Sequence, residues 1–71
     1  MKLPVGACAV DTRTGRLGVV MGHEGPYVQL RPFGGGREWD TRPQDARRAT
    51  AAEWQRAATA HAAVLSRAGT A

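Results

Sequence analysis

Short β-rich runs separated by glycine constrain the fold of this chain more than any other feature of its sequence. Three of these runs precede residue 31 and a shorter candidate follows: Val5–Val10, Leu17–Met21, Tyr27–Leu30 and Arg37–Asp40. Apolar and polar residues alternate along them, which is typical of strands with one buried face. Because the runs are short and close together, we expect a small antiparallel β-barrel of four to five strands.

The size of the chain limits what such a barrel can do. With 71 residues, it has room for one domain with a thin core, and we expect no deep catalytic pocket. The single cysteine, Cys8, excludes an internal disulfide and favours a reducing compartment. No apolar run approaches the roughly 20 residues that a membrane-spanning helix needs, and no signal-peptide core follows Met1. We therefore expect a cytoplasmic protein with no membrane partner.

The residues between the runs predict tight turns. In Asp11–Gly15, the Asp side chain can bond its own backbone two residues on, and Gly15 accepts the positive φ of a bulged hairpin. Gly22–Pro26 predicts the second turn. Further along, Gly34–Gly36 interrupts the ladder as a loop, and Arg42–Asp45 predicts a single helical turn with Pro near its start.

The alternation also assigns side chains to the two faces of the sheet. Cys8 and Val10 share one face of the first strand, which favours a core thiol over a reactive one. On the third strand Val28 and Leu30 point inward. Its outward residues are Tyr27, Gln29 and Arg31. In the fourth strand we expect Trp39 to fill the centre of the barrel, because so small a core needs large side chains.

A helical pattern begins at Thr50. Thr50 and Glu53 have the spacing of a capping box, in which each side chain accepts the other residue's backbone amide. The helix then extends to about Arg67, and an apolar side recurs at helical spacing: Trp54, Ala57, Ala58, His61, Val64 and Leu65. We expect Trp54 to pack in the core, so that the first half of the helix docks there. Beyond about His61 the helix should fray, because isolated helices of this length are marginal in water.

The groups that could carry chemistry have simpler structural explanations. His23 and Glu24 lie in a glycine turn, and the chain offers few further ligands for a metal. Gly34–Gly36 lacks the helix start and the Lys or Ser/Thr of a phosphate-binding loop. The remaining carboxylates are expected to be surface charges: Asp11, Glu38 and Asp40. We expect no metal, no cofactor and no catalytic residue.

The basic residues form the one constellation that indicates a function. The chain has ten basic and six acidic residues and a formal net charge of +4. Arginines lie around the predicted turns and strands together with one outward aromatic residue: Arg13, Arg16, Tyr27, Arg31, Arg37 and Arg42. Arginines can hold phosphates, and an aromatic ring can stack on bases, so this set favours RNA or DNA as a partner. Two alternatives stay open. The arginines are solvated or paired with Glu38 and Asp40, or the excess of arginine comes from the codon usage of a GC-rich genome.

Two resemblances rest on these residues. Val5–Asp11 followed by Thr14–Val20 resembles the glycine-centred hairpin of KOW-type barrels, which occur in ribosomal and transcription-elongation proteins, with Gly18 at the position of the motif glycine. This resemblance implies a Src-homology-3-like (SH3-like) barrel and a role at nucleic acid. The sequence from the first strand through Trp39 is also similar to small uncharacterised proteins of Streptomyces-type actinobacteria.

Together, these observations predict an SH3-like barrel in residues 1–49 and a C-terminal helix in residues 50–68 that either packs on the barrel or projects from it to meet another copy. We expect a non-catalytic binding module, an accessory or regulatory protein that contacts RNA or DNA through the arginine and tyrosine face. The alternative is a protein-interaction adaptor. It would bind a protein partner, or a second copy of itself, through a strand edge, the glycine loop or the C-terminal helix. A binder of a small effector molecule is a third class.

Overall fold

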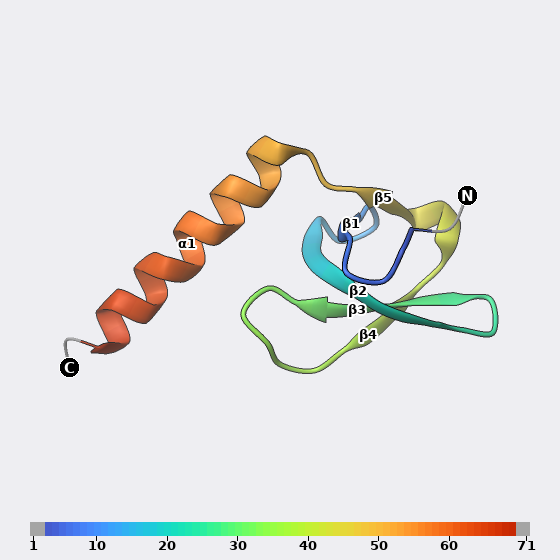
Figure 1. The fold of residues 1–71 in the computed structure, drawn as a ribbon, viewed down its shortest axis with the longest axis horizontal. Coiled ribbons are helices and arrows are strands. Elements are labelled where there is room, and N and C mark those ends of the chain that lie inside the picture. Colours follow the sequence, from blue (N-terminus) through green and yellow to red (C-terminus); the bar gives the residue numbers. More distant parts are fainter. Residues whose placement is uncertain (1–2, 70–71) are drawn as a thin grey trace.

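The computed structural model describes residues 3–69, with side chains described for residues 3–62. This part of the chain is mainly β, with one antiparallel sheet followed by one helix (Figure 1). In chain order the elements are β1 (Cys8–Asp11), β2 (Arg16–Glu24), β3 (Tyr27–Pro32), β4 (Trp39–Thr41), the 3₁₀ helix η1 (Pro43–Asp45), β5 (Ala46–Arg48) and α1 (Ala51–Gly69). None of the helical segments in residues 3–69 has the length and apolar character needed to cross a membrane.

The sheet has the strand order β4-β3-β2-β1-β5. Strands β1 to β4 pair as consecutive hairpins, and β5 returns to pair with β1. The sheet is not closed, because β4 and β5 are its edges, and η1 connects them. The Asp45 carbonyl accepts hydrogen bonds from the amide of Thr12 at 2.7 Å and from its hydroxyl at 3.0 Å. These bonds fix the end of η1 to the turn between β1 and β2.

The first turn forms as its sequence predicts. The Asp11 carboxylate accepts the amide of Arg13 at 3.0 Å, and the amide of Gly15 donates to the Asp11 carbonyl at 2.7 Å. Gly15 has φ +79°, which a residue with a Cβ rarely adopts. The predicted turn at Pro43 is also confirmed, as the 3₁₀ helix η1 with Pro at its start.

All four predicted strands need correction at their bounds, and one strand was missed. β2 continues to Glu24 and β3 to Pro32. The predicted turn Gly22–Pro26 is therefore wrong, because Gly22 to Glu24 pair with β3 and only Gly25 and Pro26 form the turn.

β1 begins at Cys8 rather than Val5, because the amide of Ala7 bonds back to the carbonyl of Pro4 in a turn. β4 begins at Trp39 rather than Arg37. The sequence gives no strand signal for β5, which is three residues long and includes two arginines. Its extended conformation comes from pairing with β1.

The core cluster lies on the inner face of the sheet and contains Ala9, Val20, Val28 and Leu30, and Val10 is also buried. The inward direction of Val28 and Leu30 is therefore confirmed. The expectation of a core thiol is wrong in part, because Ala9 enters the core and Cys8, on the other face, is half-buried. Alternation separates two faces without indicating which is inner. Burial raises the pKa of the Cys8 thiol, and the negative charge of Glu53 adds to that effect.

Asp11 is buried, contrary to the expectation from the sequence. We expected a surface charge, yet this residue is 1% exposed. Its Oδ2 accepts the indole N–H of Trp39 at 3.0 Å, which connects β1 to β4. Burial opposes a charge on Asp11. Hydrogen bonds from Trp39 and the Arg13 amide, together with the charge of Arg13, outweigh it, so the pKa of Asp11 is lowered from 3.8. The other two carboxylates, Glu38 and Asp40, are exposed as expected.

The capping box at the start of α1 is confirmed. The amide of Glu53 donates to Thr50 Oγ1 at 3.1 Å, and the amide of Thr50 donates to Glu53 Oε1 at 2.8 Å. Glu53 also forms an ion pair with Arg47 of β5 at 2.7 Å. Hydrogen bonding to Arg47, followed by that to Thr50, lowers the pKa of Glu53 to about 2. The first turn of α1 is thus tied to the neighbouring edge strand.

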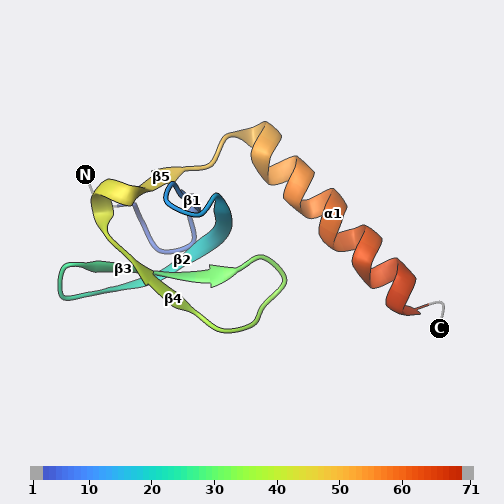
Figure 2. The same ribbon diagram turned by 180° about the vertical axis from the view of Figure 1, so that it is seen from behind.

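Beyond this first turn, α1 extends away from the sheet (Figure 1, Figure 2). The sequence predicts Trp54 in the core, but the structure places it outside. It is 38% exposed and packs edge-on against Phe33 of the β3–β4 loop, with 4.5 Å between ring centroids. His61 contacts the same ring at 5.6 Å. The helix continues past His61 to Gly69, and the side chains of the predicted apolar residues Val64 and Leu65 are outside the described residues.

Replacing Thr50 with alanine should remove the hydroxyl that accepts the Glu53 amide and lower stability by about 1 kcal/mol. Circular dichroism and thermal unfolding measure the effect. Thr59→Ala is the matched control, because Thr59 is exposed in the middle of α1 and alanine favours helix there. A Thr50→Ala protein with the helicity and midpoint of the native chain would show that the box does not stabilise α1.

Candidate nucleic-acid interface

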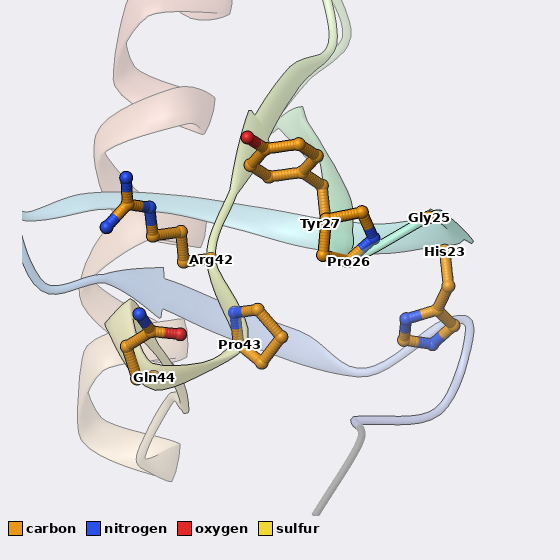
Figure 3. A pocket seen from close by; sticks show the side chains of 7 residues that line it. All are labelled: His23, Gly25, Pro26, Tyr27, Arg42, Pro43 and Gln44. Carbon is orange, nitrogen blue, oxygen red and sulfur yellow. The ribbon is translucent and has the colours of Figure 1, made fainter.

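An open hollow of about 470 Å³ lies between the β2–β3 turn and the start of η1 (Figure 3). Its lining residues are His23, Gly25, Pro26, Tyr27, Arg42, Pro43 and Gln44. Tyr27 and Arg42 belong to the residues that the sequence predicted for the interface. The structure therefore brings together one predicted aromatic ring and one predicted guanidinium.

The register between β3 and β4 explains this meeting. Val28 pairs with Thr41 in the antiparallel ladder. The residue before Val28 and the residue after Thr41 therefore lie across from each other at the end of the ladder. These residues are Tyr27 and Arg42. Both side chains are exposed, with the Tyr27 residue 42% exposed.

The walls of the hollow are mostly rigid and apolar. Pro26 precedes β3 and Pro43 begins η1, and each ring fixes its own φ. Gly25 has φ +56°, the conformation that lets the chain reverse tightly before Pro26. In Figure 3, Arg42 and Gln44 lie at one end of the hollow and His23 at the other, with Tyr27 and the two prolines between them. The ring of Tyr27 thus stands in a largely preformed site.

Some of the lining residues were not predicted for the interface. The sequence predicts His23 as a turn residue, but it lies in β2, and its Nε2–H donates to the carbonyl of Leu3 at 2.9 Å, which orients the ring. Pro26, Pro43 and Gln44 carried no functional signal of their own. The two segments that line the hollow share one sequence feature: a proline lies next to Tyr27 in the first and next to Arg42 in the second. Without the register, nothing in the sequence connects the two segments.

The other four predicted residues lie outside the hollow. Arg13 is in the β1–β2 turn, and Arg37 is in the loop before β4. Arg31 points outward from β3 opposite Val19. Arg16 begins β2, and its guanidinium carbon is 3.9 Å from the centre of the Trp39 ring, within the range of a cation–π contact. All four are exposed, but the structure does not bring the six residues into one compact site.

The arginines are not neutralised by the carboxylates that the sequence analysis considered. Among the side chains of residues 3–62, the structure shows one ion pair, Arg47–Glu53. It lies at the β5 edge of the sheet, whereas the hollow lies at the β4 edge. Neither Glu38 nor Asp40 pairs with an arginine within that part of the chain. Near the hollow, Glu24 pairs with Tyr27 in the ladder, and its carboxylate accepts a hydrogen bond from the side-chain amide of Gln29 at 3.3 Å. Arg42 therefore faces solvent with its charge available.

No cluster of three or more His, Cys, Asp or Glu side chains that could hold a metal ion is found in the described part of the chain. Comparisons of the sequence and the fold with protein-family models, curated proteins and solved structures found no match.

Proposed function

We propose that this protein is a non-catalytic module that binds nucleic acid, built on an SH3-like barrel. The strand order, with β5 returning to β1 and a 3₁₀ turn before it, supports the SH3-like assignment. The position of Gly18 supports the KOW-like hairpin, because this glycine lies where β3 and Trp39 approach closely. Actinobacterial origin stays a proposal that rests on sequence resemblance alone.

The observation that carries the proposal is the meeting of Tyr27 and Arg42 in a hollow without an acidic lining residue. An exposed aromatic ring offers a face to a base, and a guanidinium without an ion-pair partner donates to phosphate oxygens. The formal net charge of +4 draws polyanions to the protein. Arginines outside the hollow then add phosphate contacts without base recognition.

Fluorescence anisotropy with labelled single-stranded RNA, single-stranded DNA and duplex tests the proposal. We expect binding at low salt that weakens steeply as salt increases, because phosphate contacts release counterions. Arg42→Gln should weaken binding and reduce the slope of log K against log salt by about 1. Arg56→Gln is the matched control, since Arg56 is exposed on α1 and loses the same charge. Absence of binding to all three polymers at low salt would contradict the proposal.

A protein-interaction adaptor is the second candidate. It is favoured by the open edges of the sheet at β4 and β5, and by the exposed part of Trp54 on a helix that extends from the sheet. Unpaired edge strands are templates for a further strand. This function would give salt-tolerant binding that Trp54→Ala weakens and Arg42→Gln leaves unchanged. The two variants therefore separate the two candidates.

A further inference from the structure

The shape of the hollow restricts which form of nucleic acid it can take. Tyr27 offers its ring within a hollow of about 470 Å³ whose other walls include Pro26 and Pro43. A base in a duplex is stacked on both faces and paired at its edge, so it has no face free for this ring. A base in a single strand can leave its neighbours and stack on an aromatic side chain.

The charges around Tyr27 indicate on which side of the ring the phosphate backbone of a bound strand passes. Arg42 lies across from Tyr27 on the η1 side, and Glu24 pairs with Tyr27 on the β2 side. A phosphate is attracted to the first and repelled by the second. The backbone of a bound strand should therefore pass over Arg42. Gln44, at the same end of the hollow, carries an amide that can both donate to and accept from a base edge (Figure 3).

From this geometry we infer that the hollow holds one unstacked base of a single-stranded nucleic acid, with the base on the Tyr27 ring and the adjoining phosphate on Arg42. The inference rests on the proposed function and adds the strandedness of the partner and the place of the base. A free phosphate would satisfy Arg42 but would leave the apolar walls uncovered. The base is therefore the part of the ligand that fits the hollow.

The test uses oligonucleotides that separate base from backbone. One is a single strand about ten nucleotides long, which is within the site sizes of small barrels. A second has the same phosphates but only abasic residues, and a third carries one thymine in the centre of the abasic strand. These three strands are DNA. An RNA strand with the length and base sequence of the first, and a DNA duplex of the same length, complete the set. Affinity is measured by anisotropy, and amide NMR shifts locate the contact.

We expect the single thymine to tighten binding of the abasic strand on the order of tenfold, by stacking on one aromatic ring. Shifts should then appear at the residues that line the hollow, whereas the duplex should bind through phosphate contacts alone and leave the Tyr27 amide unshifted. Equal affinities for RNA and DNA would indicate that the protein contacts only base and phosphate. A higher affinity for RNA would indicate a further contact to the 2′-hydroxyl.

Variants of Tyr27 assign the effect to the ring. Tyr27→Ala should remove the gain from the single thymine and leave the affinity for the abasic strand unchanged, whereas Tyr27→Phe should keep the gain. Glu24→Gln should tighten binding of every strand by removing the repelling charge. Thermal unfolding of each variant shows whether its fold is intact.

The outcomes separate the inference from the function on which it rests. Salt-dependent binding that is equal for the abasic and single-thymine strands would overturn the base site and leave nucleic-acid binding in place. A gain from thymine that survives Tyr27→Ala would place the base elsewhere and also overturn the inference. Absence of binding to every ligand at low salt would overturn both.

Discussion

Replacing Trp39 with alanine should lower the free energy of unfolding by about 3–5 kcal/mol, the range for truncation of a large aromatic side chain. Trp39 does not fill the centre, contrary to the expectation from the sequence; it is half-buried and packs against the core cluster, and its indole N–H satisfies the buried carboxylate of Asp11. The truncation therefore opens a cavity and removes a hydrogen bond from a buried charge. Domains have only about 5–15 kcal/mol of stability in total, so the variant should be largely unfolded. Urea denaturation followed by circular dichroism measures the change.

Trp39→Phe is the control that separates packing from the hydrogen bond. Phenylalanine keeps much of the ring and lacks the N–H that donates to Asp11. The folded-state pKa of Asp11 is lowered, so its contribution to stability is present above the unfolded pKa and is lost as pH falls through the folded value. Without the donor the folded pKa should rise, and stability should depend less on pH in the acid range. A native stability for Trp39→Ala would show that β4 does not close the core.

Local signals in the sequence predicted two of the elements that depend on near neighbours, whereas the predicted turn Gly22–Pro26 is wrong because pairing with β3 extends β2 to Glu24. The Asp11–Gly15 turn and the box between Thr50 and Glu53 each need residues only a few positions apart, and both are confirmed. β5 could not be found in this way, because its two arginines have no strand pattern and only pairing with β1 extends them. The place of Trp54 depends on where α1 points, which local spacing does not determine.

The candidate site illustrates the same limit at longer range. Alternation along β3 placed Tyr27 on the outer side of that strand, but its partner depends on the register of β4. A shift of one residue would bring Thr41 or Pro43 across from Tyr27 in place of Arg42. The buried state of Asp11 has the same origin, since it comes from Trp39 on another strand. Residues that meet across strands need the register, which composition and spacing do not give.

Gly18 shows how the sheet depends on one position without a side chain. A Cβ at Gly18 would lie 2.7 Å from the carbonyl oxygen of Arg31 and 2.9 Å from Cη2 of Trp39. The first neighbour is backbone of the paired strand, and the second is the ring that closes the core. Neither can move without shifting β3 or Trp39. Glycine at this position therefore lets β2 and β3 pair beneath the tryptophan.

Gly18→Ala should consequently lower the free energy of unfolding by about 2–3 kcal/mol, near the upper end of the usual cost of overpacking. Gly22→Ala is the matched control on the same strand, because its Cβ would meet only the flexible end of Gln29 at 3.3 Å. That variant should be neutral, or stabilising by up to about 1 kcal/mol through the loss of chain entropy in the unfolded state. Urea denaturation of the two proteins side by side makes the comparison. Equal stabilities would mean that β3 and Trp39 do not approach β2 at Gly18, and the packing of Trp39 over this hairpin would have to be redrawn.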